Sequence, residues 1–215
     1  MSSFRARALA LFVVAALPAS FVLRAGDARA SVSIAVAFEP LVKDSSAVAI
    51  VTPTEQTCVW ENGRIYTYTR VHADTAVAGE VALGAEVWVR TMGGVVGHIG
   101  QSVDGEPVLT VGRPSLLFLR AGPAGAFEVT ARAQGQFPVT LDESTKASKL
   151  MKSSAVGVLL PPKQALQAEK TLSPKALQSA PAPAAPLFAA EALHGRRVED
   201  AVKDIAAAWK RLHAK

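Results

Sequence analysis

The chain has 215 residues, and its 23 basic and 18 acidic side chains give a formal net charge of +5. A single cysteine, Cys58, excludes an intrachain disulfide and a cysteine-rich zinc framework. The sequence contains no Gly-x-Ser-x-Gly, Ser-x-x-Lys or His-Glu-x-x-His motif, which excludes the hydrolases that depend on them.

The first thirty residues predict a signal peptide. Arg5 and Arg7 precede the apolar stretch 8–23, and Ala28-Arg29-Ala30 forms a small-x-small cleavage site before Ser31. With 16 residues and an internal proline, the stretch is shorter than the roughly 20 apolar residues of a membrane-spanning helix. We therefore expect a periplasmic or secreted bacterial protein, with an uncleaved membrane anchor as the alternative.

The next elements are a short helix and two strands. Residues 38–44 predict a helix that tolerates Pro40 in its first turn, and residues 47–51 predict a buried strand. Residues 64–73 alternate between two faces with a strict period of two, which predicts another strand. Asn62-Gly63, directly before it, suits the positive φ angles of a type I′ hairpin turn.

A glycine-rich segment, 92–100, follows a third predicted strand at 86–92. A phosphate-binding loop needs a helix after its glycines, because the helix N-terminus presents backbone N–H groups to the anion. The residues after Gly100 predict a strand and a turn instead. We therefore interpret the segment as a β-turn followed by a strand at 95–103 that bends at Gly97.

Three further strands are predicted at 114–120, 127–133 and 136–139. Short strands separated by regular turn signals are typical of sandwiches and barrels. We therefore expect residues 31–142 to form a mainly β domain, a small closed or partly open antiparallel barrel of OB-like character. The short N-terminal helix and a C-terminal amphipathic helix complete this fold class.

Composition and charge change after residue 142. Residues 31–142 hold 7 basic and 11 acidic side chains, whereas residues 143–215 hold 12 and 6. Residues 143–188 are rich in Ala, Pro and Lys, which predicts an extended linker. The basic tail is typical of a solvated segment, and an anionic partner is its alternative interpretation.

The last predicted domain, 189–215, contains an amphipathic helix. Its apolar positions recur at steps of three and four residues and are Val198, Val202, Ile205, Trp209 and Leu212. Acidic residues in its first turn and basic residues in its last follow the order that the helix dipole favours. We expect this face to dock on the barrel and bury Trp209; a protein partner and a membrane surface are the alternatives.

His98 is the one candidate for catalysis. It lies in the glycine-rich segment, and its possible helpers in sequence are Asp104 and Glu106. The alternative is an ordinary strand histidine at the surface or at the edge of a pocket. Because the histidines lack metal-ligand spacing, we expect no metal, no cofactor and no catalytic residue.

Aromatic side chains are the other weak candidates for binding. Trp60, Tyr66 and Tyr68, together with Trp88, could stack on a sugar or a base, or could pack in the core instead. Trp209 on the C-terminal helix is a further binding candidate. We interpret Cys58 as a small buried side chain, with a disulfide between two copies of the chain as the alternative.

Five segments resemble a group of exported bacterial proteins of unknown function. They are AVAIVTP, GRIYTYTRV, VAGEVALGAEVWVRTMGGVVG, EPVLTVGRPSLLFLRA and FEVTARAQGQFPV, within residues 38–139. The resemblance implies a small closed barrel with OB-like or netrin-module-like character, and it carries over no catalytic residue. The chain departs from the group with Ala78-Gly79 for Lys-Gly and Arg113-Pro114 for Gly-Glu. Ser31 stands where metalloproteinase inhibitors with a netrin-like barrel have a cysteine, which disfavours such an inhibitor.

These features predict an exported, non-catalytic β-barrel module that binds an unknown ligand or has a structural role. The first alternative is a periplasmic hydrolase or metal-dependent enzyme that uses His98. The second is an adaptor that binds an anionic surface or an envelope protein through its basic C-terminal tail. We expect no nucleic-acid partner, and membrane contact only through the signal segment or the C-terminal helix.

Overall fold

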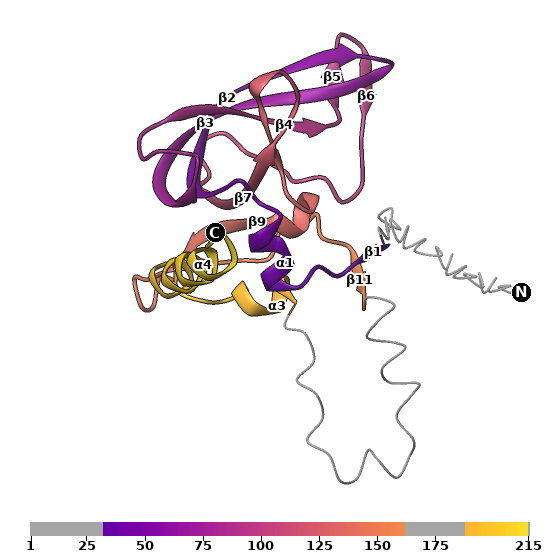
Figure 1. Ribbon diagram of the computed structural model, residues 1–215. Coiled ribbons are helices and arrows are strands. Elements are labelled where there is room, and N and C mark those ends of the chain that lie inside the picture. The colour runs from indigo at the N-terminus through magenta and orange to yellow at the C-terminus, as the bar shows by residue number, and fades with distance from the viewer. Residues whose placement is uncertain (1–31, 162–187, 215) are drawn as a thin grey trace, which may run out of the picture.

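The computed structural model describes residues 32–161 and 188–214, and the predicted signal peptide lies outside them. In Figure 1 the barrel strands lie above a layer of helices. The elements in chain order are β1 (Val32–Ile34), α1 (Phe38–Lys43), β2 (Ala47–Glu61), β3 (Arg64–Gly79), β4 (Glu86–Met92), β5 (Gly94–Val96), β6 (Ile99–Gln101), β7 (Ser115–Ala121), η1 (Pro123–Gly125), β8 (Phe127–Val129), η2 (Arg132–Gly135), β9 (Gln136–Leu141), β10 (Ser148–Leu150), β11 (Val158–Leu160), α3 (Ala189–Leu193) and α4 (Val198–Leu212).

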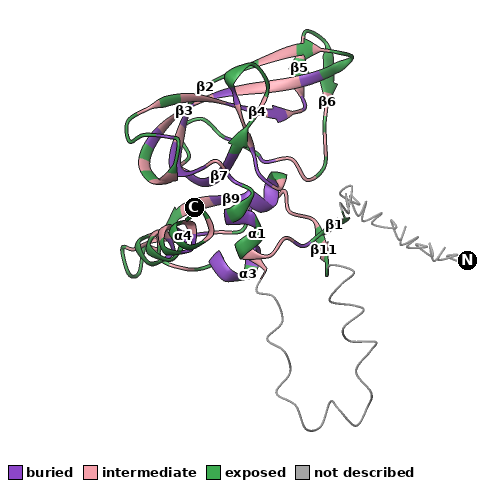
Figure 2. Ribbon diagram, viewed as in Figure 1, coloured by how far each residue is buried: buried purple, intermediate pink, exposed green. Residues whose placement is uncertain are grey.

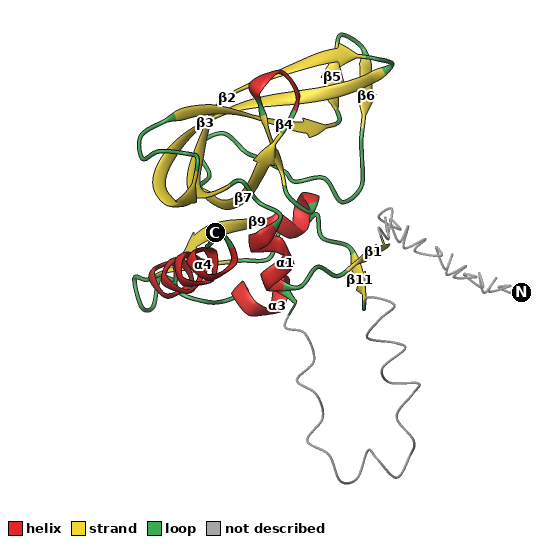
Figure 3. Ribbon diagram, viewed as in Figure 1, coloured by secondary structure: helices red, strands yellow, loops and turns green. Residues whose placement is uncertain are grey.

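Five strands close into a barrel in the order β7-β2-β3-β4-β8, because β8 pairs with both β4 and β7. Figure 3 shows β2, β3, β4 and β7 of this barrel in yellow. This confirms the predicted mainly β fold with a small barrel, a short N-terminal helix and a C-terminal helix. The β4–β8 pairing is parallel and the other four are antiparallel, so the barrel is mixed. A ring with an odd number of strands cannot alternate direction throughout, and this explains the one parallel pairing.

The first wall of the barrel is the long β2–β3 hairpin. Its turn, Asn62-Gly63, has φ angles of 48° and 78°, both positive as a type I′ turn requires. The predicted alternation in β3 is confirmed, since Ile65, Val71 and other residues of that face are fully buried. Register shifts near Pro53 and two other positions mark bulges, which let the hairpin curl around the barrel.

Two predicted strands differ in the structure. The strand expected at 95–103 is the antiparallel hairpin β5–β6, in which Gly97 has a φ of 60° at the first position of a two-residue turn. Glycine at that position suits a type II′ turn, so the chain reverses where we predicted a bend. The strand expected at 127–133 ends at Val129, because Ala131 and Arg132 have φ angles of 56° and 55° and lead into η2.

The segments 47–51 of β2 and 115–119 of β7 are buried on both faces of the sheet, so they read as unbroken apolar runs (Figure 2). One face fills the barrel interior with Ala47, Ala49, Val51, Leu117 and Leu119. The other face packs under the helices with Val48, Ile50, Leu116 and Phe118. A single pair of strands therefore serves two hydrophobic cores.

The C-terminal helix α4 docks on this second core, as expected. Its fully covered residues are Ala201, Ile205 and Ala208. Trp209 is only partly buried and stacks on His213 with ring centroids 3.8 Å apart, so it is less buried than predicted. An ion pair between Arg211 and Glu39 ties α4 to α1.

The structure corrects the prediction of an extended linker for part of 143–188. β10 pairs with β9 and buries Leu150 completely, and β11 pairs in parallel with β1. Strands of three residues are too short to produce a recognisable pattern in an Ala-, Lys- and Ser-rich sequence. The rest of the predicted linker, 162–187, lies outside the described residues.

Candidate functional site

His98 lies at the exposed turn of the β5–β6 hairpin. The carboxylate of Glu106 forms an ion pair with Arg132 and accepts a hydrogen bond from the backbone N–H of Met92. Among the described residues, no hydrogen bond or ion pair joins His98 to an acidic side chain. The sequence neighbours proposed as its helpers are therefore not assembled around it.

The β5–β6 hairpin covers one face of the β2–β3 hairpin near its Asn62-Gly63 turn. A Cβ at Gly94 would lie 2.7 Å from Cys58 Sγ and 2.6 Å from Thr67 Oγ1, so only glycine fits there. Cys58 is partly rather than fully buried beneath this contact. Trp60 is two residues further along the same face of β2 and is 52% exposed.

Tyr66 and Tyr68 lie on the opposite face of the β2–β3 hairpin, beside side chains of β4. In the register of β3 and β4, Tyr68 pairs with Arg90 and Arg70 pairs with Trp88. The guanidinium carbon of Arg90 lies 3.4 Å from the ring centroid of Tyr66, and that of Arg70 lies 4.9 Å from the ring of Trp88. We call the surface formed by these five residues the aromatic–arginine face.

A chain of polar contacts crosses this face. The Tyr68 hydroxyl donates to Glu61 Oε1 at 2.7 Å, and Arg90 Nη2 donates to Glu61 Oε2 at 2.8 Å. Arg90 Nη1 also binds Glu128, whose other oxygen binds Arg120 at 2.8 Å. The hydrogen bonds from Tyr68 and Arg90 lower the pKa of Glu61, whereas burial and the bond to Glu61 raise the pKa of Tyr68.

Arg90 is the centre of this network, and its side chain is 12% exposed. Among the described residues, its Nε is the buried side-chain polar atom without a hydrogen-bond partner. Leaving such a donor unsatisfied costs about 1–3 kcal/mol. The other N–H groups of Arg90 that contact carboxylates are satisfied by Glu61 and Glu128.

A cavity of about 420 Å³ opens on the aromatic–arginine face. We call it the aromatic cavity. Its lining residues are Thr57, Val59, Glu61, Tyr68, Trp88 and 124–126. Most of this lining is apolar. The hydrogen-bonded side chains of Glu61 and Tyr68 form its polar edge. Such a combination is typical of small-molecule sites.

Sequence reasoning identified Tyr68 and weighed Trp88, but it missed Glu61. It also missed Arg90. The period of two in 86–92 puts Trp88 and Arg90 on one face and could have indicated both. The candidates Trp60, His98 and Trp209 do not line this cavity.

The described residues contain no group of three or more His, Cys, Asp or Glu side chains arranged to hold a metal ion. None of their helices has the length and apolar character needed to cross a membrane. In comparisons with known proteins, no family model, no curated protein and no solved structure matches the chain.

Proposed function

We propose that this protein is an exported, non-catalytic binding module of the bacterial cell envelope whose ligand occupies the aromatic cavity. The signal-peptide pattern of residues 1–30 supports export. The resemblance of residues 38–139 to exported bacterial proteins with an OB-like or netrin-module-like barrel supports the same location. The observation that carries the binding role is the cavity between Tyr68, Trp88 and the bonded carboxylate of Glu61.

The lining of the cavity fits a sugar ring. Aromatic rings present flat apolar surfaces, which complement the apolar face of a pyranose, while Glu61 lies at the edge. Each Glu61 oxygen accepts one protein hydrogen bond and keeps lone-pair capacity for a ligand hydroxyl. The volume of about 420 Å³ lies within the range of about 300–1,000 Å³ that small-molecule sites have.

The polar groups of this cavity favour binding over catalysis. A glycosidase typically uses two carboxyl groups on either side of the scissile bond. In the described lining, Glu61 is the one carboxyl group, and its pKa is lowered by Tyr68 and Arg90. A carboxylate held in its charged form is a poor general acid.

The two alternative functions have less support from the geometry. An enzyme that uses His98 would need partners at the tip of an exposed turn. An adaptor that uses the C-terminal helix would bind through outward-facing basic residues, because the opposite side of α4 packs on the second core.

The test is a titration of the chain from residue 31 with cellohexaose, chitohexaose and maltohexaose, followed by calorimetry and tryptophan fluorescence. We expect at least one of these sugars to bind with a Kd between about 1 µM and 1 mM, which corresponds to about −8 to −4 kcal/mol. Trp88→Ala should weaken binding at least about tenfold, because it removes one wall of the cavity. Trp60→Ala is the matched control, since it removes an exposed tryptophan from the opposite face.

Tyr68→Phe sharpens the test, because it keeps the ring and removes only the hydroxyl that Glu61 accepts. We expect this variant to bind several-fold more weakly than the wild type. Equal losses in Trp88→Ala and Trp60→Ala would place the site elsewhere. If none of the three sugars binds at concentrations up to 10 mM, any binding free energy is weaker than about −2.7 kcal/mol. This result would overturn the sugar assignment.

A further inference from the structure

A second cavity, of about 280 Å³, includes Tyr66 and Arg90 of the aromatic–arginine face in its lining. Four arginines from four separate elements line it: Arg64 at the start of β3, Arg90 in β4, Arg120 in β7 and Arg132 in η2. We call it the arginine cavity. Its residues are distant in sequence, so the strand pairings of the barrel bring them together.

The carboxylates of this cavity are already engaged by the protein. Glu128 binds Arg90 through Oε1 and Arg120 through Oε2, at 3.1 and 2.8 Å. Glu106 binds Arg132 Nε at 3.1 Å, and its other oxygen accepts from the backbone N–H of Met92. Each carboxylate oxygen in the lining therefore has a protein donor.

The positive charges exceed the negative ones at this site. Glu61 does not line the cavity, but it accepts a hydrogen bond from Arg90 Nη2. The four guanidinium groups are therefore accompanied by three carboxylates, Glu61, Glu106 and Glu128. Within the described residues, Arg64 pairs with no carboxylate and contacts the Met92 sulfur at 4.0 Å. A guanidinium group has five N–H donors, so the rim retains both charge and donors for a ligand.

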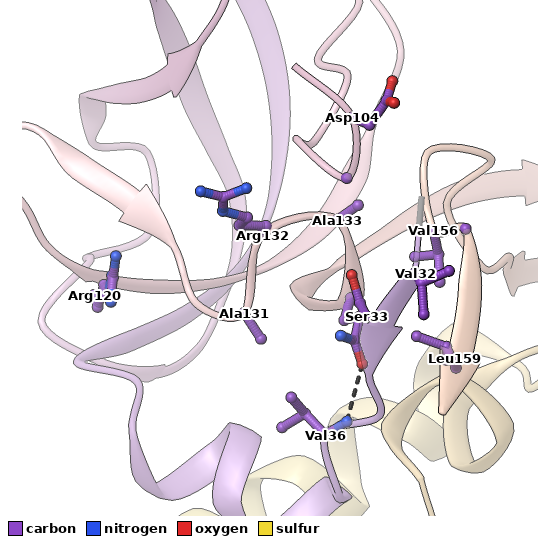
Figure 4. Close-up of a pocket in the computed structure, with 13 residues that line it drawn as sticks. Val32, Ser33, Val36, Asp104, Arg120, Ala131, Arg132, Ala133, Val156 and Leu159 are labelled. Atoms are coloured by element: carbon purple, nitrogen blue, oxygen red, sulfur yellow. Dashed lines mark hydrogen bonds between the residues drawn. The ribbon is translucent and has the colours of Figure 1, made fainter. Parts of the chain in front are cut away.

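The arginine cavity has a buried floor and an exposed rim. Arg90 and Glu106 are each 12% exposed, whereas Arg120 and Arg132 are more than half exposed. A neighbouring cavity of about 420 Å³ also includes Arg120 and Arg132 in its wall, across from Leu159 in Figure 4. These two guanidinium groups therefore border both cavities.

The turn that carries Arg132 is held against the loop that carries Glu106. Ala131 and Arg132 both have left-handed φ angles, 56° and 55°, which non-glycine residues rarely adopt. The Ala133 N–H donates to the carbonyl of Gly105, and Arg132 forms an ion pair with Glu106. These contacts place the Arg132 guanidinium group at the rim of the cavity.

We propose that the arginine cavity binds a small oxyanion with at least two negative charges, either a phosphate compound or a polycarboxylate. Guanidinium groups match the paired oxygens of both ligand types with two parallel hydrogen bonds. Arg64 and Arg132 bind the anion from the rim, and Arg90 supplies a fixed positive charge from the floor. The site is separate from the aromatic cavity, so it does not depend on the proposed sugar ligand.

The test measures binding of sodium pyrophosphate and sodium citrate by calorimetry, with sodium chloride at matched ionic strength as the reference. We expect at least one of these anions to bind the wild-type chain, and the stronger of the two identifies the ligand class. Arg64→Gln breaks no ion pair of the described residues and should weaken binding about tenfold. The double variant Arg64→Gln/Arg132→Gln should abolish it.

Arg113→Gln is the matched control, because Arg113 is an exposed arginine outside the cavity lining. It should bind both anions as the wild type does. If Arg113→Gln weakened anion binding as much as Arg64→Gln does, net charge alone would explain the effect. This result would overturn the proposal. Failure of both anions to bind more tightly than chloride would overturn it as well. Trp88→Ala should keep its anion affinity, which separates this result from failure of the sugar proposal.

Discussion

The two ends of β2 have opposite surroundings, although they belong to one strand. Residues 47–51 are covered on one face by the barrel interior and on the other by the helices. Residues 54–61 are exposed or half-buried, with the β5–β6 hairpin on one face and the aromatic cavity on the other. A strand packed on both faces has no surface left for a ligand, so the proposed binding surface begins where the helix layer ends.

The largest effect should come from the packed end. Phe118 pairs with Val48 of β2 and contacts Phe137 edge-on, with ring centroids 6.1 Å apart. Phe118→Ala should lower the free energy of unfolding by about 3–5 kcal/mol, because it leaves a cavity in the second core. Urea unfolding measures this change. The folded fraction should keep the sugar affinity of the wild type, and a loss of that affinity would contradict the separation of the two ends.

The helix contribution can be tested at Ile205, which is fully buried in the same core. Ile205→Ala should cost about 2–5 kcal/mol, within the range for buried aliphatic residues. Ala207→Ser, on the same helix at an exposed position, is the control and should change stability by about 0.5 kcal/mol or less. Separate unfolding transitions for helix and barrel would show that α4 is not part of the cooperative unit.

At the open end, Gly94→Ala should cost about 1–3 kcal/mol, because the new Cβ would meet Cys58 and Thr67. Displacement of the hairpin should also speed modification of Cys58 by a thiol reagent. Gly100→Ala is the control, since Gly100 lies in the same hairpin without a positive φ and its new Cβ would meet only Val95 Cγ2, at 3.8 Å. Its effect should be smaller in both measurements, and the opposite order would contradict the close approach over Cys58.

The smallest effect concerns pH. Tyr68 and Arg90 lower the pKa of Glu61 below its usual value of about 4.3. A depressed folded-state pKa adds stability above the unfolded-state pKa, and this stability is lost as the pH falls through the folded value. The wild type should therefore lose stability below about pH 5, and Glu61→Gln should lose less between pH 7 and pH 3. The midpoint of urea unfolding, measured for both proteins across this pH range, tests the prediction. An equal pH dependence in the two proteins would count against the hydrogen-bond network around Glu61.

Much of the fold could be predicted from local patterns. The alternation in 64–73, the Asn62-Gly63 turn and the helical spacing in 198–212 each depend on residues close in sequence. The second half of β2 was missed, because Pro53 interrupts the strand pattern and polar residues follow it. The bulges recorded there show how the strand continues past that proline.

The site was harder to predict, because its members come from separate strands. Glu61 and Glu128 both bind Arg90 only because β2 pairs with β3, β3 with β4, and β4 with β8. A short parallel pairing such as β4–β8 has no local signature in the sequence. Tyr68 was found because an aromatic residue in a strand attracts attention by itself, whereas an arginine does not.

The pairings that join the first and last described elements have a consequence for the order of folding. Glu39 of α1 contacts Arg211 of α4 across 172 positions, and β1 needs β11 as its partner. Such distant contacts form slowly, because the entropy of closing a long loop is lost before the contact is gained. The β2–β3 hairpin can form as soon as it is synthesised, while the apolar outer faces of β2 and β7 stay bare until the last helix arrives. A stalled or shortened chain would therefore expose Val48, Ile50 and Phe118 and be prone to aggregation.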